Sequence, residues 1–494
     1  MNKYILSIKL ILILCLSLQA QTSNIQIKVI TEAENEPLMG ATVYFEALEK
    51  GSVTNFDGIA EFTEIPDGQH QIIISFLGFE TFETTIQIPS NTALVFKLKE
   101  GGNQLDAVVL QSTRSTRTVR KIPTRIEFIG AEELGEKAIM NPTNISMVLR
   151  ESTGIQIQQT SANSANQQIR IQGLDGRYTQ LLKDGFPLYS GFSGGLSVMQ
   201  IPPLDLKQVE LVKGSSSTLY GGGAIAGLVN LVSKQPDEES PELTFMLNQT
   251  SALGTTANAF WSQRFEKVGF TLYTSGTNQV PYDPNKDDFS DIPQIRSVSV
   301  NPKFFWYPTD STKLWFGVNT AYEDRLGGDL QVIEGSTDSL DIFSEQNLSK
   351  RAATQLHFEH QFSKGGILTA RNSFSYFDRG ITIPNWAFMG EQLASFSEVN
   401  WSKEKDKTDW IIGANLVTDR FTENTANSNV LPRGYEYLTT GVFAQNNLDL
   451  GEKFVLESGM RVDYNTDFGF FPLPRLSLLA KPTEKLTARL GGGM

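Results

Sequence analysis

A short glycine-rich motif contains the residue types that serine hydrolases use. Gly191, Ser193 and Gly195 fit the pattern G-x-S-x-G, which works when the serine lies between a strand and a helix and a histidine base is near. The context differs here, because the stretch runs on to Pro202 and Pro203 and the downstream histidines lie in a dissimilar part of the chain. We expect a connecting or ligand-facing loop, and we assign no catalytic residue.

Histidine and acidic side chains offer no convincing metal site. His70 lies far from the other histidines, and His357 and His360 are three positions apart on an expected strand, where their side chains point to opposite faces. The acidic run at residues 283–291 is similar to a calcium loop, but it lacks the central glycine and has Gln294 in place of the bidentate glutamate. A solvated loop is the simpler interpretation, and we predict neither a metal ion nor another cofactor.

Length and charge limit the classes of protein to consider. The chain has 494 residues, of which 40% are apolar, so it is too large for a single hydrophobic core. With 42 Lys and Arg against 55 Asp and Glu, its formal net charge is −13. This acidic balance, without a run of basic residues, argues against nucleic acid as a partner because such binding needs clustered positive charge.

Residues 1–20 have the features of a secretory signal peptide. Lys3 and Lys9 accompany an apolar run at residues 10–18, and Ala20 is the expected last residue before cleavage. An uncleaved anchor is the alternative, but the apolar run is too short to span a bilayer. The only cysteine, Cys15, lies in this leader, so we expect no disulfide bond in the mature chain. Export to the envelope of a bacterium or to its exterior follows.

Residues 24–99 alternate apolar and polar side chains at the period of β-strands. Ile25, Ile27 and Val29 form the first series, and turn sequences such as NFDG and PDG separate the later ones. The spacing predicts a small antiparallel β-sandwich. The sequence NIQIKVITEAENEPLMGATVYFEALEKGSVTNFDG resembles the carboxypeptidase-regulatory-like domain that precedes many exported proteins of the Bacteroidetes type. The resemblance implies a spacer or docking module.

A polar linker at residues 100–118 contains one apolar segment. Such a segment, unable to bury itself locally, can add as a strand to the sheet edge of another protein. The sequence LDAVVLQSTR resembles the TonB box of outer-membrane receptors, whose usual form in this branch has Glu in place of Ala107. The resemblance implies an energy-coupling protein of the TonB type as a partner. The residues of the expected box are Leu105, Asp106, Ala107, Val108, Val109 and Leu110.

Residues 119–235 are expected to mix helices and strands. Asn141 and Pro142 predict the start of a short helix, and Asp184-Gly185 is a hairpin signal. Strands are expected at residues 155–159, 168–172, 179–183 and 208–213. The series NPTNISMVLRESTGIQIQ, IRIQGLDGRYTQLLKDGFPLY and PPLDLKQVELVKGSSSTLYGGGAIAGLVNLVSK resemble the plug domain of TonB-dependent receptors in order and spacing.

This resemblance assigns roles to plug residues. Arg170, Glu210 and Lys213 match buried or barrel-facing charges that hold a plug in place. The full set of expected structural positions is Arg170, Gly173, Asp184, Gly185, Glu210, Lys213 and Gly214. Ligand contacts are expected from the outward plug loops 160–166 and 189–196, with Tyr189, Phe192 and Ser193 as candidates, and from the barrel loops 276–293 and 325–345.

From residue 240 to residue 494 the sequence alternates over many segments. Phe454, Leu456 and Met460 share one parity, and Glu457 and Arg461 share the other. Strands of roughly ten residues with one apolar and one polar face are typical of an outer-membrane barrel. A soluble sandwich would explain the alternation but not the charged second face. The predicted fold class is therefore mainly β: an antiparallel β-sandwich, an α+β plug and part of a transmembrane antiparallel β-barrel.

Together these features resemble a TonB-dependent outer-membrane receptor and transporter, and we expect no enzyme. The family resemblance implies outer-membrane lipid, a coupling protein and a small-molecule or metal-chelate ligand as partners. A ferric siderophore is the first expectation, with cobalamin, other chelates and oligosaccharides as alternatives. A passive porin or an adhesin would not need the box.

The number of expected strands is too small for a closed barrel of this class. We count about thirteen candidates after residue 240, whereas about 22 are needed to enclose a plug. An open barrel would expose unpaired backbone groups to lipid. The sequence analysis therefore predicts that the natural product continues beyond residue 494.

Overall fold

The computed structural model contains two compact units. The first holds the chain up to residue 108 together with residues 118–120, and the second holds the remainder. The structure describes residues 22–32, 35–48, 50–76, 79, 81–89, 94–99, 110–114, 122–189, 191–193, 201–214, 217–238, 240–336, 342–424, 431, 433–451, 453–483 and 486–494. The predicted signal peptide and residues 105–109 of the predicted TonB box lie outside these residues.

The first unit is a β-sandwich, as predicted. One sheet has the order β4-β1-β7 and the other the order β3-β2-β5-β6. The inward series Ile27, Val43, Phe45, Ile72 and Ile74 is completely buried between them. Only β7 departs from the antiparallel prediction, because it crosses over from β6 and pairs parallel to β1. The strands are β1 (Thr22–Thr31), β2 (Thr42–Phe45), β3 (Lys50–Val53), β4 (Ile59–Pro66), β5 (Gly68–Ser75), β6 (Phe82–Ile88) and β7 (Leu94–Leu98), with the short helix η1 (Glu46–Leu48).

The second unit begins with a mixed domain, here called the plug. Its main sheet has the order β12-β11-β14-β13-β8, and β9 and β10 form a separate hairpin. The central strand β14 is buried along its whole length, which agrees with its mainly small and apolar residues, and its one amide side chain, Asn230, is hydrogen-bonded to Glu210. Its strands are β8 (Ile126–Ile129), β9 (Ile155–Gln159), β10 (Gln167–Ile171), β11 (Thr179–Lys183), β12 (Phe186–Tyr189), β13 (Leu206–Lys213) and β14 (Gly227–Ser233). Its helices are η3 (Gln111–Thr113), α2 (Ala131–Met140), α3 (Ser146–Arg150), η5 (Gly176–Tyr178), η6 (Gly191–Ser193), α4 (Ser217–Tyr220) and η8 (Gly221–Ala224).

The helix predicted to start at Asn141 was misplaced. Asn141 is the C-cap of α2, and α3 begins only at Ser146. The Asn144 side chain accepts a hydrogen bond from the Ser146 backbone N–H at 3.0 Å and so serves the start of α3. The helix α2 was not predicted, because Gly130 provides no side-chain cap and Gly135 lowers its helix propensity.

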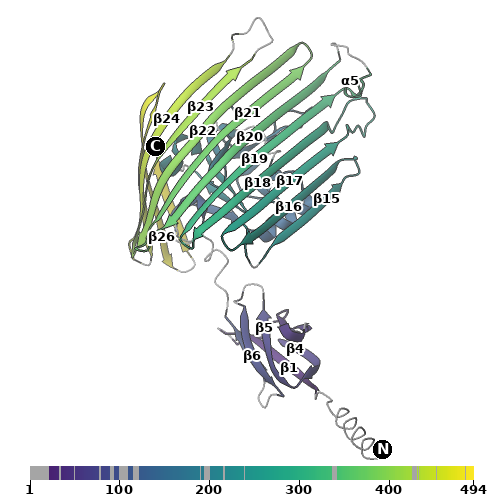
Figure 1. Cartoon of the computed structure of the whole chain (residues 1–494), viewed down its shortest axis with the longest axis vertical. Helices are drawn as coiled ribbons and strands as arrows, with labels where there is room; N and C mark the ends of the chain where they lie inside the picture. The colour runs from purple at the N-terminus through teal and green to yellow at the C-terminus, as the bar shows by residue number, and fades with distance from the viewer. Residues whose placement is uncertain are drawn as a thin grey trace, which may run out of the picture. The chain divides into compact units, whose positions relative to one another are not determined.

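The rest of the second unit is one antiparallel sheet of 13 strands in sequence order, here called the barrel sheet (Figure 1). Long connections at residues 280–293, 329–343 and 424–433 lie at one end, the long-loop end, together with the short turns 384–385 and 466–468, whereas each connection at the other end, the short-turn end, has at most five residues. The strands are β15 (Glu242–Gln249), β16 (Thr255–Phe265), β17 (Val268–Gln279), β18 (Gln294–Thr309), β19 (Thr312–Gly328), β20 (Ser344–Gln361), β21 (Ile367–Ile383), β22 (Trp386–Lys405), β23 (Thr408–Glu423), β24 (Gly434–Asp449), β25 (Phe454–Asn465), β26 (Gly469–Thr483) and β27 (Leu486–Gly493), and the loop after β19 holds α5 (Leu330–Ile333).

The two faces of the barrel sheet follow the predicted alternation. Phe454 and Met460 are 42% and 46% exposed, whereas Glu457 and Arg461 are each 3% exposed. The prediction of strands of roughly ten residues was too short, since β18 to β24 contain 16 to 20 residues each. Each of these strands pairs with a neighbour on both sides, so its backbone N–H and C=O groups stay hydrogen-bonded over a length greater than ten residues. The strands therefore continue past the length that we predicted.

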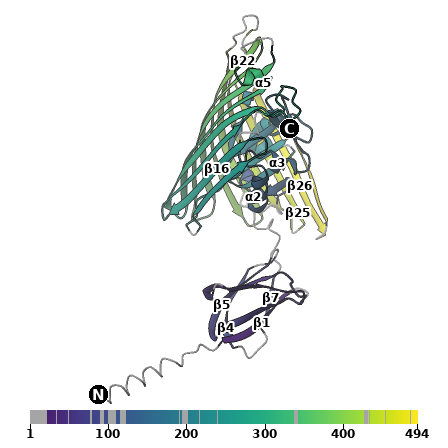
Figure 2. The same cartoon turned by 90° about the vertical axis from the view of Figure 1, so that its right-hand side faces the viewer.

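The plug packs against the polar face of the barrel sheet. Figure 2 shows α2 and α3 on the concave side of the sheet. Phe186 of the plug lies edge-on to Trp315 and Phe396 of the sheet, with ring centroids 5.6 and 6.5 Å apart. Among the described residues, no helix is both long and apolar enough to cross a membrane.

Candidate functional site between plug and barrel sheet

The five residues 110–114, here called the latch segment, begin with the last residue of the predicted TonB box, and all of them except the half-buried Gln111 are buried in the second unit. Leu110 is 1% exposed. The backbone N–H groups of Gln111 and Ser112 donate to the two carboxylate oxygens of Glu210 at 2.8 and 2.7 Å. Glu210 is itself completely buried in β13. The plug therefore binds the latch segment through one carboxylate.

Arg114 connects the same segment to the barrel sheet. Its guanidinium donates to the Leu219 carbonyl at 2.7 Å and to the Glu398 carboxylate on β22 at 2.6 Å. The Tyr220 and Phe443 rings lie 4.6 and 5.0 Å from this guanidinium. Because both charged side chains are at most 3% exposed, this is a desolvated ion pair.

Tyr220 of the plug also binds the latch segment through a hydrogen bond. Its hydroxyl donates to the Ser112 carbonyl at 2.7 Å. Burial raises the pKa of Tyr220 to about 12 although the Arg114 charge opposes this shift. The phenol is therefore neutral and remains a hydrogen-bond donor at physiological pH.

Glu398 has further donors that belong to the barrel sheet alone. Arg371 on β21 is its direct cross-strand partner and donates to it at 3.0 Å. The Asn400 amide donates to the same carboxylate oxygen at 3.1 Å. Two guanidinium groups thus share one buried carboxylate, with one contributed by the latch segment and one by the sheet.

A second ionic contact joins the turn between β11 and β12 to the barrel sheet. Asp184 and Gly185 form this predicted hairpin turn with φ of 56° and 78°, a conformation that favours glycine at the second position. Asp184 pairs with Lys303 of β18 and accepts from the Ser233 backbone N–H at 2.8 Å. Burial would raise the pKa of Asp184, but the charges of Lys303 and Lys183 outweigh it and lower the pKa.

Other predicted structural positions serve the plug internally. Lys213 pairs with Glu127 and donates to the Thr153 carbonyl at 2.5 Å. Arg170 lies 3.9 Å from Asp175 of the same domain. Gly173 and Gly214 have φ of 80° and 93°. The roles assigned to these residues stay predictions, and Asp184 and Glu210 are the ones that connect to other parts of the unit.

The ligand-loop candidates lie toward the long-loop end. The Phe192 ring stacks on Phe421 of β23 with centroids 4.3 Å apart, and its backbone N–H donates to the Tyr435 hydroxyl at 2.7 Å. The Ser193 backbone N–H donates to Gln392 at 3.2 Å. The side chain of Tyr189 and residues 194–196 lie outside the described part of the chain. In the other plug loop, Ser161 donates to Glu345 at 2.7 Å.

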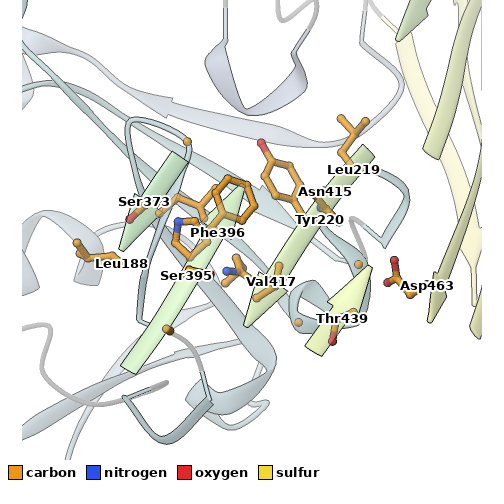
Figure 3. Close-up of a pocket in the computed structure, with 18 of the residues that line it drawn as sticks. Leu188, Leu219, Tyr220, Ser373, Ser395, Phe396, Asn415, Val417, Thr439 and Asp463 are labelled. Carbon is orange, nitrogen blue, oxygen red and sulfur yellow. The ribbon is translucent and has the colours of Figure 1, made fainter. Parts of the chain in front are cut away.

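Cavities lie between the plug and the barrel sheet in the described part of the chain, and two of them adjoin Arg114. The larger, of about 290 Å³, is lined by plug residues such as Leu188 and Tyr220 and by Ser373, Ser395 and Thr439 of the sheet (Figure 3). The second, of about 240 Å³, is lined by Leu110, Asp184, His357, Thr369 and Ser402. Arg114 lines both.

The residues that join plug and barrel sheet were only partly visible in the sequence. Arg371 and Glu398 have the inward parity of their strands, so their charge on the polar face was a usable signal. The contact of Glu398 with Arg114 could not be predicted from the sequence, because the two residues are 284 positions apart. In the described residues, no group of three or more His, Cys, Asp or Glu is arranged to hold a metal ion.

Three family models match the chain in succession. The CarboxypepD_reg-like domain matches residues 25–110, the TonB-dependent Receptor Plug Domain matches residues 118–228, and the TonB dependent receptor-like β-barrel matches residues 247–493. The last of these covers half of the chain. Their order agrees with the sandwich, the plug and the barrel sheet described above.

Relatives of known name are distant. The TonB-dependent receptor P3 of Formosa agariphila is 22% identical over 74% of this chain, and the vitamin B12 transporter BtuB of Photobacterium profundum is 24% identical over 43% of it. The chain spans 36% and 35% of the length of these two proteins. Both are named as a receptor or transporter, not as an enzyme.

Solved structures share the fold of the second unit. A variant of the ferric enterobactin receptor PfeA from Pseudomonas aeruginosa, solved with enterobactin, has a TM-score of 0.60 and 17% identity, covering 76% of this chain and 62% of that one. The siderophore receptor PirA from Acinetobacter baumannii has a TM-score of 0.59 and 18% identity, covering 78% and 62%. With the matching β-barrel model, these likenesses establish that the chain belongs to the TonB-dependent receptor family, whose members are outer-membrane β-barrel proteins.

Proposed function

We propose that this protein takes up a scarce ligand across the outer membrane by TonB-dependent transport. The observation that carries the proposal is the latch segment, which the plug binds through Glu210 and the barrel sheet binds through Glu398. Because the latch segment begins with the last residue of the predicted box, a pull on the box would act directly on both contacts. A passive porin would have no use for such a connection.

The orientation follows from the lengths of the connections. Barrels of outer membranes have short periplasmic turns and longer extracellular loops. The long-loop end, with Phe192 and Tyr435, would then face the exterior, and the short-turn end would face the periplasm. The leader and the sandwich fit export and a periplasmic docking module.

A ferric siderophore is the ligand that we propose first. The solved neighbours include receptors named for ferric enterobactin and for siderophores, while a curated relative is named for vitamin B12. The aromatic side chains Phe192, Phe388, Phe421 and Tyr435 pack together near the long-loop end, and the edges of this cluster could contact the aromatic groups of a chelating ligand. Competition among ferric siderophores, cobalamin and oligosaccharides for the purified receptor decides between these ligands.

Replacement of Val109 by proline tests the coupling. Proline removes a backbone donor from the segment that pairs with the coupling protein. We expect Val109→Pro to abolish uptake while surface binding of the ferric chelate remains. Gly102→Pro, in the polar stretch before the box, is the matched control and should transport normally. Equal uptake by Val109→Pro and the parent would contradict the assignment of the box.

A further inference from the structure

The short helix η6 is bound to the barrel sheet through two of its backbone N–H groups. The Phe192 N–H donates to the Tyr435 hydroxyl on β24 at 2.7 Å. The Ser193 N–H donates to the side-chain oxygen of Gln392 on β22 at 3.2 Å. Both acceptors belong to side chains that can also donate, so the contact requires each of them to turn the correct atom toward η6.

Asp419 lies on β23, between the two strands that carry these acceptors. Its side chain is a diagonal neighbour of both, because Phe421, two residues further along β23, is the direct cross-strand partner of Gln392 and of Tyr435. The Gln392 amide donates to one Asp419 carboxylate oxygen at 2.7 Å, and the Tyr435 hydroxyl donates to the other at 3.4 Å. One carboxylate thus contacts both side chains that bind η6.

The chemistry of a carboxylate sets the direction of these hydrogen bonds. An ionised carboxylate only accepts, whereas a backbone N–H only donates. The Gln392 amide therefore turns its NH₂ group toward Asp419, which leaves its oxygen for the Ser193 N–H. The Tyr435 proton likewise points to Asp419, which leaves the hydroxyl oxygen for the Phe192 N–H.

The Phe192 ring packs where the barrel sheet has a glycine. The ring contacts Phe421, Phe388 and Phe377, with ring centroids 4.3, 5.7 and 5.9 Å away. Gly390 leaves room for this packing, because a Cβ atom there would lie only 2.8 to 3.0 Å from atoms of three of these rings, that of Phe192 included. The sheet thus accommodates the side chain of η6 as well as its backbone.

We propose that Asp419 is a positioning residue of the ligand site. It directs Gln392 and Tyr435 toward η6, so that Phe192 is already in place near the long-loop end before a ligand arrives. A loop that is ordered in advance spares the ligand the entropy cost of ordering it, which raises the affinity. That η6 contacts the ligand rests on the proposed function, whereas the effect of Asp419 on η6 does not.

Hydrogen–deuterium exchange of the purified, ligand-free receptor tests this effect. Asp419→Asn offers one acceptor and one donor in place of two acceptors, so it can serve only one of the two side chains correctly. We expect peptides with the Phe192 and Ser193 amides to exchange roughly threefold to tenfold faster, the effect of one lost hydrogen bond. Peptides of β14 should exchange as in the parent. Asp378→Asn, at a carboxylate on β21 that pairs with Lys350, is the matched control and should leave η6 unchanged.

An exchange of groups between positions 392 and 419 provides the rescue. Gln392→Glu combined with Asp419→Asn moves the carboxylate to β22, where it can accept from the Ser193 N–H and from the new amide. That amide keeps an oxygen for the Tyr435 proton, so every donor again has an acceptor, and exchange at η6 should return to the parent rate. Gln392→Glu alone places two carboxylates together and should raise exchange.

Three results would overturn the positioning role. The first is parent-like exchange at η6 in Asp419→Asn, and the second is a double variant that exchanges as fast as Asp419→Asn. The third is faster exchange in β14 as well as in η6, which would show a general loss of stability rather than a local one.

Replacement of Gly390 tests the packing of the ring independently. Gly390→Ala should displace the Phe192 ring and raise the exchange of η6, because the added Cβ would collide with the rings around it. Gly380→Ala on β21 is the matched control, since a Cβ there would lie 3.9 Å from the Phe388 carbonyl oxygen, an ordinary contact. Equal exchange in the two variants would contradict the role of Gly390.

Binding of a ferric chelate connects this arrangement to the proposed function. The probe is ferric enterobactin, or whichever ligand prevails in the competition described above. Asp419→Asn should bind it roughly threefold to tenfold more weakly than the parent, and the double variant should bind it as the parent does. Equal affinities beside faster exchange would overturn the link between η6 and the ligand. If the parent takes up no ligand while the exchange results hold, the proposed function fails and the effect of Asp419 on η6 stands.

Discussion

Glu398 is the residue at which the latch segment and the barrel sheet meet. It is 2% exposed and accepts from Arg114, Arg371 and Asn400. A lone buried carboxylate would be unfavourable, and the number of its donors explains why it is tolerated there. Asp184 has a similar position on the other contact, with Lys303 and Ser233 as partners. Two buried carboxylates, Glu398 of the sheet and Asp184 of the plug, thus contribute to the contact between plug and sheet.

Asp184→Ala should weaken the plug. The change leaves Lys303 buried without its carboxylate, and breaking such a pair costs about 3–5 kcal/mol. Urea titration followed by the protease sensitivity of the plug should show that loss. Asp175→Ala removes a carboxylate whose side chain is 31% exposed and should cost about 0–1 kcal/mol. Equal stability of the two variants would contradict the structural role of Asp184.

The lowered pKa of Asp184 predicts an acid dependence. A carboxyl whose folded pKa is depressed adds stability above its unfolded pKa of about 3.9, and this stability is lost as the pH falls through the folded value. The urea midpoint of the parent should therefore fall below about pH 4 more steeply than that of Asp184→Asn. Parallel curves would show that another group is responsible.

At the scale of elements, the alternation of side chains was enough to predict the barrel sheet. Inward Glu457 and outward Phe454 are separated because strand side chains alternate, a rule that needs no tertiary information. Strand ends were not predictable, since pairing with neighbours rather than sequence extends them. Helix α2 was not predicted because its N-cap, Gly130, has no side chain that could signal a helix start. The helix buries Leu134, a tertiary contact that the sequence alone does not show. The latch contacts were beyond prediction because they join distant positions.

The short helix η6 presents an aromatic side chain, Phe192, that stacks on the sheet. Phe192→Ala removes the stack on Phe421 and the contact with Phe388. If Phe192 also makes one aromatic contact with the ligand, its loss costs about 0.5–1.5 kcal/mol, and the equilibrium affinity for the ferric chelate should then fall roughly threefold to tenfold. Phe56→Ala, at a phenylalanine of the sandwich that is 83% exposed, is the control and should bind as the parent does. Unchanged affinity of Phe192→Ala would remove η6 from the ligand site.

At the scale of the whole molecule, the arrangement of the described parts fits the proposed TonB-dependent transport. The sandwich, the plug and the barrel sheet follow each other along the chain, and the latch segment lies where a pull on the box would reach plug and sheet together. The polar face of the sheet meets a plug that carries its own charges, so the interface combines buried ion pairs and hydrogen bonds with cavities. Such an interface is suited to local release.

Uptake of a radiolabelled ferric chelate by cells that express the receptor, with and without a functional TonB system, tests the central claim most directly. We predict accumulation inside the cells only when the coupling system is active, and surface binding alone when it is absent. Accumulation at equal rates in both strains would contradict the account and show a passive pore.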